Sequence, residues 1–220
     1  MGDPVSEERS ALVDLVALMA RLRAECGWKA AQTHRTLARH LLEETYETLE
    51  VIEAAGESGA IDDEHLAEEL GDLLLQVYFH AAIAAETGRF DIEDVAAGLA
   101  TKLVRRNPHV FGDAAERLTD PAAINESWEA IKAVEKQRDD LLEGIPLALP
   151  ALARATKVLD RLERAGVAVT PDPAGGLGER LLALVAEARA AGVDPELELR
   201  AAARRYRDRV HTWERSHPPA

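Results

Sequence analysis

The segment LLEETYETLE, residues 41–50, places four glutamates on a stretch that otherwise suits a buried helix. Glutamates three or four residues apart share a helix face and repel one another, and the segment has no lysine or arginine to offset the repulsion. Around it, alanine and leucine dominate, aromatic residues make up only 4% of the chain and β-branched runs are few. Because alanine and leucine favour helices, the sequence predicts an all-α protein.

Capping residues and apolar periodicity predict the helices on either side of this segment. Thr33 is a good N-cap for a helix to about residue 55, and Asp62 or Asp63 caps a helix that ends near Gly88. Residues 26–32 are expected to form a connector. Other helices are predicted at about 7–24, from Asp91 to Asn107-Pro108, from Asp120-Pro121 onward, and after residue 150. Short connections between such helices predict an antiparallel helical bundle.

The apolar stripes of the first three helices predict which side chains face the core. The stripe residues are Leu12, Leu15, Val16, Met19 and Leu22, then Leu37, Leu41, Leu49 and Ile52, then Leu66, Leu70, Leu73, Leu74 and Val77.

The segment GIPLALP, residues 144–150, predicts a linker between a helical domain, 1–143, and a helical C-terminal region, 151–220. GLGERLLAL (176–184) is a weak echo of ELGDLLLQV (69–77), which suggests a degenerate second repeat. The echo has lost the acidic pair, since Gly176 stands where Glu69 stands and Glu179 where Asp72 stands. We therefore expect residues 151–220 to do no chemistry.

Charge and cysteine content limit the class of protein. A net charge of −14 argues against a nucleic-acid backbone as the main partner. The single cysteine, Cys26, cannot form an internal disulfide and is compatible with a reducing cytoplasm. The N-terminus is acidic and unlike a signal peptide, and no apolar run approaches the roughly 20 residues of a membrane span, so neither secretion nor a membrane is expected.

An acidic block without any lysine or arginine covers residues 40–88 and contains two spaced motifs. EExxE gives Glu44 and Glu47 at i, i+3 on one predicted helix, with Glu43 beside them, and ExxD gives Glu69 and Asp72 on the next, with Glu68 beside them. An antiparallel hairpin lets the two pairs face each other, where four carboxylates without a cation repel strongly. A hard divalent ion, Mg²⁺ or Mn²⁺, offsets that repulsion with oxygen ligands.

The ordinary explanation of one EExxE motif is a solvated acidic face. Here the carboxylates adjoin apolar positions instead of forming a fully polar side, and the second motif follows about twenty residues later on an adjacent helix. The combination favours a metal site.

Basic and aromatic residues follow the acidic block. Lys102 and Arg106 lie at i, i+4 with Arg105 between them, and Trp128 and Lys132 have the same spacing on a later helix. Cations beside a metal site can hold a polyphosphate, and a tryptophan can stack on a base. The alternatives are that the cations only complement a helix C-terminus and that Trp128 belongs to the core.

These segments together resemble the MazG family of nucleoside triphosphate pyrophosphohydrolases, an all-α NTP pyrophosphatase family. The resemblance runs from about Leu12 to Glu143 and includes CGWKAAQTH, LLEETYE, EELGDLLLQVYFHA, FDIEDV, KLVRRNPHVF and NESWEAIK. It implies a dimer-forming fold, homodimeric or a higher homo-oligomer, and Mg²⁺-dependent cleavage of a nucleoside triphosphate between the α and β phosphates. A role in cleaning the nucleotide pool is the expected purpose.

The resemblance also implies residue roles. Glu44, Glu47, Glu69 and Asp72 correspond to metal ligands, and Glu43 or Glu68 could position the attacking water. Lys102, Arg106, Trp128 and Lys132 correspond to positions that contact the nucleotide, and Arg105 beside them is a further candidate for substrate binding. The chain departs from the family pattern at Gly27 and Lys29, where CPWD is common.

Two readings remain open on the sequence alone. The first is this hydrolase, with a broad, a deoxynucleotide or a damaged-nucleotide substrate. The second is a non-catalytic helical scaffold that keeps the fold and binds partners through its acidic face.

Overall fold

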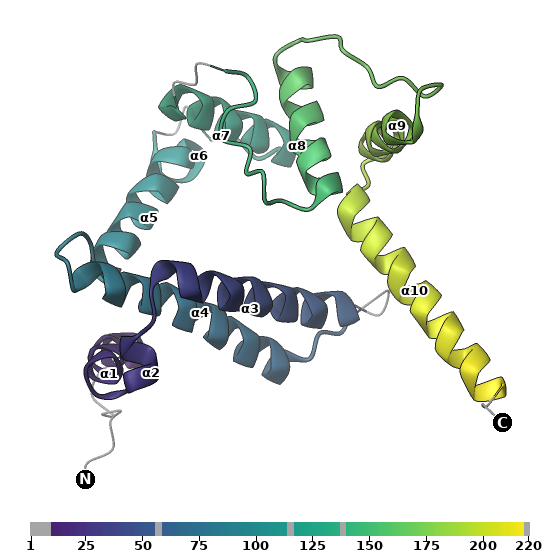
Figure 1. Ribbon diagram of the computed structural model, residues 1–220. Helices are drawn as coiled ribbons and strands as arrows, with labels where there is room; N and C mark the ends of the chain where they lie inside the picture. Colours follow the sequence, from purple (N-terminus) through teal and green to yellow (C-terminus); the bar gives the residue numbers. More distant parts are fainter. Residues whose placement is uncertain (1–9, 56–58, 114–116, 137–139, 218–220) are drawn as a thin grey trace. The chain divides into compact units, whose positions relative to one another are not determined.

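The computed structural model describes residues 10–55, 59–113, 117–136 and 140–217, and every regular element in these ranges is a helix (Figure 1). The predicted all-α class is thereby confirmed. The elements are α1 (Ala11–Glu25), α2 (Gly27–Ala30), α3 (His34–Ala54), α4 (Asp63–Ala85), α5 (Ile92–Arg106), α6 (Pro108–Phe111), α7 (Pro121–Lys136), α8 (Ala151–Arg164), α9 (Leu177–Ala190) and α10 (Pro195–Ser216). The chain divides into two compact units, Met1–Ile131 and Lys132–Ala220.

The predicted caps start the helices of the first unit. The Thr33 side chain accepts a hydrogen bond from the Thr36 backbone N–H, while the Thr33 N–H donates to the Thr36 hydroxyl at 2.9 Å. Asp62 accepts from the backbone N–H of His65, and Asp91 caps α5. Each cap supplies an acceptor for a backbone donor that has no partner within the helix, which is why these boundaries can be read from the sequence. The start predicted near residue 7 lies outside the described residues, and α1 is described from Ala11 onward.

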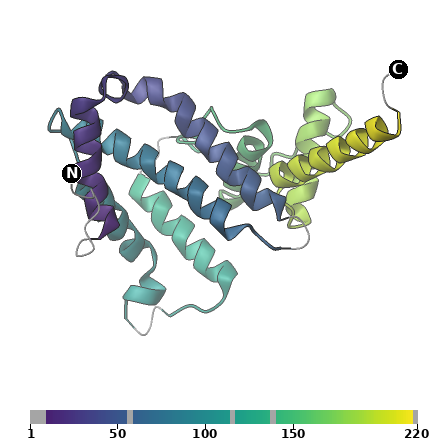
Figure 2. The ribbon, with the colours of Figure 1, turned by 90° about the horizontal axis from the view of Figure 1, so that it is seen from below.

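The pair α3 and α4 forms an antiparallel hairpin and has the most extensive packing in the unit (Figures 1 and 2). Thr48 is buried between the two helices. Its hydroxyl donates to the carbonyl oxygen of Glu44 at 2.8 Å and lies 3.5 Å from the carbonyl oxygen of Glu69. The segments that carry the two acidic motifs therefore lie directly opposite each other.

The core of the first unit lies where α1 crosses α4. Its buried cluster consists of Met19, Leu37, Tyr78 and Phe79, and the Tyr78 hydroxyl donates to the carbonyl oxygen of Leu12 at 2.8 Å. The predicted stripes are wrong in part, because six of their residues are each at least 39% exposed: Leu12, Val16, Leu41, Ile52, Leu70 and Val77. On α4 the reason is that this helix packs against α1 as well as α3, which turns Tyr78 and Phe79 inward and leaves Leu70 and Val77 uncovered.

The predicted connector after α1 contains a short helix, α2, which Arg23 holds in place. The Arg23 guanidinium donates to the carbonyl oxygens of Lys29, Ala30 and Gln32 and to both carboxylate oxygens of Glu86. This hydrogen bonding, with the charge of Arg23, lowers the pKa of Glu86. One side chain thus fastens the α2 segment to α1 and to the end of α4.

A pair of histidines joins the start of α3 to α4. The rings of His34 and His80 stack with centroids 5.0 Å apart, and their Nδ1 atoms are 2.7 Å apart. Arg89 donates to His34 Nε2 at 2.9 Å, so the His34 proton is on Nδ1 and is donated to His80. Burial and the neighbouring His34 lower the pKa of His80, which favours a neutral imidazole at that position.

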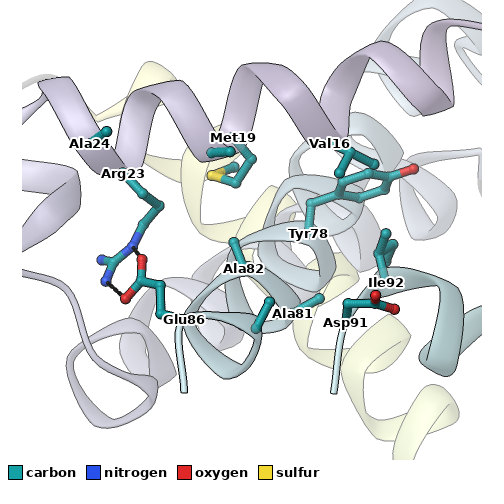
Figure 3. Close-up of a pocket in the computed structure, with 12 residues that line it drawn as sticks. Val16, Met19, Arg23, Ala24, Tyr78, Ala81, Ala82, Glu86, Asp91 and Ile92 are labelled. Atoms are coloured by element: carbon teal, nitrogen blue, oxygen red, sulfur yellow. Dashed lines mark hydrogen bonds and ion pairs between the residues drawn. The ribbon is translucent and has the colours of Figure 1, made fainter. Parts of the chain in front are cut away.

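A largely apolar cavity of about 350 Å³ lies between α1, α4 and the start of α5. Figure 3 shows the Arg23–Glu86 ion pair at one end of it and Tyr78 with Ile92 at the other. None of the acids of the two sequence motifs is among its lining residues, so this cavity is distinct from the predicted metal site.

After Gly88, which has a φ of +63°, the chain turns and α5 leaves the hairpin from the end where α4 finishes (Figure 1). In α5 no residue is buried, and Val95, Leu99 and Leu103 form an exposed apolar stripe. Among the described residues, no helix is both long enough and apolar enough to cross a membrane.

The second unit is built from α8, α9 and α10, which pack on one another around Leu159 and Val185. Arg189 of α9 lies 2.6 Å from carboxylate oxygens of both Asp160 and Glu163 of α8. An ion-pair network therefore joins the two helices.

Candidate metal and nucleotide site

Three of the four predicted ligands converge on the hairpin. Glu44 and Glu47 of α3 and Glu69 of α4 each offer a carboxylate oxygen, and these oxygens all lie within 4.8 Å of one another. The i, i+3 spacing puts the first two on one face of α3, and the Thr48 contact sets Glu69 opposite them. We call Glu44, Glu47 and Glu69 the acidic cluster.

Asp72, the fourth predicted ligand, lies close enough to act on the acidic cluster through its charge. The pKa of Glu44 is raised first by burial, then by the charge of Asp72, by the charge of Glu47 and a hydrogen bond with it, and by the charge of Glu69. All four residues of the two motifs therefore contribute to one negative field. In this negative field the charged form of Glu44 is unfavourable unless a cation is present.

One carboxylate oxygen of the cluster is buried without a protein partner. Glu69 has a side chain that is only 13% exposed, and its Oε1 lies 3.1 Å from Nε2 of His65. Its Oε2 is buried and has no hydrogen-bond partner in the described structure. Because a buried acceptor normally has a partner, this oxygen fits a cation ligand. The cluster consists only of carboxylates, and Mg²⁺ and Mn²⁺ prefer oxygen donors, so the residues fit a hard divalent ion.

The two glutamates predicted to position water lie outside the acidic cluster. Glu43 and Glu68 are both exposed. Glu43 Oε2 lies 3.0 Å from Nδ1 of His40, one turn earlier on α3. Both are next to a cluster residue in sequence, but their exposure gives no reason to prefer one over the other.

The predicted nucleotide-binding residues form a separate group. Lys102 and Arg105 are exposed on the last turns of α5, and Arg106 is partly buried with its guanidinium carbon 5.4 Å from the ring centre of Trp128. Lys132 is the first residue of the second unit. The structure therefore brings Arg106 and Trp128 together. These residues follow α4, whereas Glu69 and Asp72 lie in its first half.

A second basic site was missed by the sequence reasoning. A hollow of about 450 Å³ beside the first half of α3 is lined by Trp28, Gln32, Arg35, Thr36, Arg39 and His40. Trp28 is 54% exposed and its ring meets that of His40 edge-on at 6.0 Å. Arg35 and Arg39, at i, i+4 directly before EExxE, were the available signal. The aromatic ring and two cations next to Glu43 and Glu44 are suited to an anionic, ring-containing ligand.

A third hollow, of about 600 Å³, lies between α3 and α4 on the other side of the acidic cluster. Glu47 and Glu69 line it, and so do Glu50, Asp62 and His65. Glu50, one turn after Glu47, therefore faces a recess that adjoins the cluster.

Comparison with known proteins supports the resemblance of the motifs. Residues 32–111 match the MazG nucleotide pyrophosphohydrolase domain. The chain is 48% identical to an uncharacterised protein of Streptomyces cacaoi over 92% of this chain and 82% of that protein. It is 36% identical to the Thermotoga maritima protein named nucleoside triphosphate pyrophosphohydrolase/pyrophosphatase MazG, over 91% of this chain and 84% of that protein.

A Mycobacterium tuberculosis protein named nucleoside triphosphate pyrophosphohydrolase is 41% identical over 97% of this chain, which spans only 61% of that longer protein. The matched domain contains α3, α4 and α5 and with them all the acids of the two motifs. With an acidic cluster at the centre of this hairpin and relatives that align along nearly its whole length, the chain belongs to the MazG family.

Proposed function

We propose that this chain is a Mg²⁺-dependent nucleoside triphosphate pyrophosphohydrolase that cleaves (d)NTP between the α and β phosphates to give (d)NMP and pyrophosphate. The observation that carries the proposal is the acidic cluster, three carboxylates within 4.8 Å of one another with a buried, unpartnered oxygen on Glu69. The names of the Thermotoga and mycobacterial relatives support the same reaction. Removal of unwanted nucleotides from the pool is the purpose we infer.

Glu44, Glu47, Glu69 and Asp72 would hold the cation, Mg²⁺ or in its place Mn²⁺. When bound, the ion supplies Lewis-acid polarisation of the phosphate oxygens and makes a water more acidic. Glu43 or Glu68 accepts the proton of the attacking water, as an exposed carboxylate beside the cluster can do. The departing pyrophosphate gains negative charge, which a guanidinium or ammonium group stabilises.

Two groups of residues are proposed to hold the nucleotide. Lys102, Arg105, Arg106 and Lys132 contact phosphates, and Trp128 stacks on the base or ribose next to Arg106. The hollow lined by Trp28, Arg35 and Arg39 is a second place for these contacts, and it adjoins Glu43 and Glu44 on the same helix.

The proposed reaction predicts that pyrophosphate appears only with metal. Each of the eight NTPs and dNTPs is incubated with the protein, with Mg²⁺, with Mn²⁺ and with EDTA, and both monophosphate and pyrophosphate are quantified. We expect equal amounts of the two products with Mg²⁺ and none with EDTA. Release of inorganic phosphate and a diphosphate would place the cleavage at the wrong bond. A protein without turnover on any nucleotide would favour the scaffold interpretation.

We also propose that the chain forms a homodimer through α5. Val95, Leu99 and Leu103 follow one face of this helix and are 38%, 48% and 43% exposed, and α5 contributes no buried residue in the described structure. A helix with an uncovered apolar stripe gains stability by packing it against a second copy.

The dimer proposal predicts that a charge on the stripe gives a monomer. Leu99→Glu should halve the mass measured by size-exclusion chromatography with light scattering, because the charge would lose its hydration in an apolar interface. Ala97→Glu, on the opposite face of the same helix, is the matched control and should leave the mass unchanged. A wild-type protein with the mass of one chain would contradict the proposal.

We further propose that residues 151–220 are a degenerate second repeat after a first domain at 1–143 and a linker at 144–150. One turn in each half of the chain supports this proposal. In the first, Gly88 is followed by Asp91, which caps α5. In the second, Gly192, with a φ of +73°, is followed by Asp194, which caps α10. The second unit lacks the EExxE motif, so it is given no part in the reaction.

A further inference from the structure

We propose that His65 is a positioning residue for Glu69, which fixes the carboxylate so that one oxygen remains available to the metal. This inference rests on the metal site proposed above, and it concerns a residue that neither acidic motif contains. His65 Nε2 lies 3.1 Å from Glu69 Oε1, one turn apart on α4. The other carboxylate oxygen, Oε2, is the buried one without a partner.

The direction of this hydrogen bond is fixed by chemistry. An ionised carboxylate only accepts hydrogen bonds, so His65 Nε2 carries the proton and donates it to Oε1. A neutral imidazole protonated on Nε2 is enough, and the proposal needs no change in the charge of His65. With Oε1 occupied in this way, rotation of the carboxylate about its last bond would break the contact. Oε2, the buried oxygen without a partner in the described structure, is therefore kept free to act as a ligand.

The position of His65 is itself held by the helix start. Its backbone N–H donates to Asp62 Oδ1 at 3.1 Å, which fixes the first turn of α4. Its side chain is 53% exposed, whereas that of Glu69 is 13% exposed, and both side chains line the hollow that adjoins the cluster. Removing a group that orients a metal ligand through a hydrogen bond typically lowers metal affinity or activity by about 10–100-fold.

Equilibrium binding of Mn²⁺ to the full chain, measured by electron paramagnetic resonance of the free ion, tests this role. We expect His65→Ala to weaken Mn²⁺ binding by about tenfold or more. His65→Gln places an amide N–H near the position of Nε2 and should restore most of the affinity, whereas the shorter His65→Asn should not. At saturating Mn²⁺ the kcat of His65→Ala should return close to that of the wild type, because the metal is then bound in both.

Two controls separate positioning from a general effect on folding. His211 forms an exposed histidine–glutamate pair with Glu214 at 3.1 Å on α10, which contains neither acidic motif, and His211→Ala should leave Mn²⁺ affinity unchanged. The melting temperature and helicity of metal-free His65→Ala should match the wild type, since alanine is the better helix former and offsets the loss of one exposed pair.

The outcomes distinguish this inference from the function on which it rests. If Glu69→Gln binds Mn²⁺ as tightly as the wild type, the acidic cluster is not the metal site, and both proposals are overturned. If Glu69→Gln binds weakly but His65→Ala binds like the wild type, only the positioning role is overturned. The same holds if the glutamine variant binds no better than the asparagine variant, because the hydrogen bond is then not the cause.

Discussion

Glu44→Gln should lower metal-dependent pyrophosphate release by at least about a hundredfold. Loss of a residue that only supports a metal ligand typically costs up to about a hundredfold, and Glu44 is itself a proposed ligand. The amide keeps the size of the side chain but removes the charge that attracts a divalent cation, at the position where the charges of Asp72, Glu47 and Glu69 converge. The measurement is kcat/KM for the best nucleotide over a range of Mg²⁺ concentrations.

The same substitution should leave the metal-free protein at least as stable as the wild type. The pKa of Glu44 is raised in the folded chain, so its ionisation as pH rises through the raised pKa costs the folded state stability. A neutral amide removes that cost. Thermal unfolding in EDTA at neutral pH should therefore show an equal or higher melting temperature for Glu44→Gln.

Glu93→Gln is the matched control, because Glu93 is an exposed acid in the first turn of α5 and belongs to neither motif. It should keep wild-type turnover. Full activity in Glu44→Gln would show that the ligand assignment is wrong, and a lower melting temperature in EDTA would show that Glu44 has a structural role.

Phe79→Ala should destabilise the first unit by about 3–5 kcal/mol, the usual cost of truncating a buried phenylalanine. Phe79 is 2% exposed and packs with Met19, Leu37 and Tyr78 at the crossing of α1 and α4. Truncation leaves a void among side chains from three helices, which cannot all move inward together. The acidic hairpin depends on this crossing, so turnover should fall as the fraction of folded protein falls.

The measurement is urea unfolding followed by hydrogen exchange, read separately for peptides from α1–α4 and from α8–α10. The two units need not unfold together, and a single transition would hide the effect. Protection should fall in α1–α4 only. Phe111→Ala, at a side chain that is 61% exposed, should change stability by less than about 0.5 kcal/mol. Equal effects of the two substitutions would contradict the assignment of the core.

Helix starts could be predicted because the cap is a local interaction. Thr33, Asp62 and Asp91 each accept a hydrogen bond from the backbone N–H three residues later, and so does Asp120 from Ala123 at 2.9 Å. Such a contact depends on sequence spacing alone. The apolar stripe of α4 was less predictable, because which of its faces is buried depends on where α1 crosses it.

The candidate site shows the same division. The i, i+3 pairs identify four acids from the sequence alone, and the structure brings the carboxylates of three of them together. His65 carried no signal that distinguished it from other exposed histidines, since its contact with Glu69 matters only because Glu69 Oε2 is buried. The hollow at Trp28 was likewise hidden, because it depends on how Arg23 of α1 fastens the α2 segment ahead of α3.

The sequence by itself determined the all-α class, the helix starts and the two acidic motifs, because each depends on interactions within about one helical turn. Only the tertiary structure decided that Glu44, Glu47 and Glu69 share one site, that Glu69 Oε2 is left without a partner, and that Phe79 rather than Val77 enters the core. Those features depend on how α1, α3 and α4 pack, and packing is set by contacts between residues that are far apart in the chain.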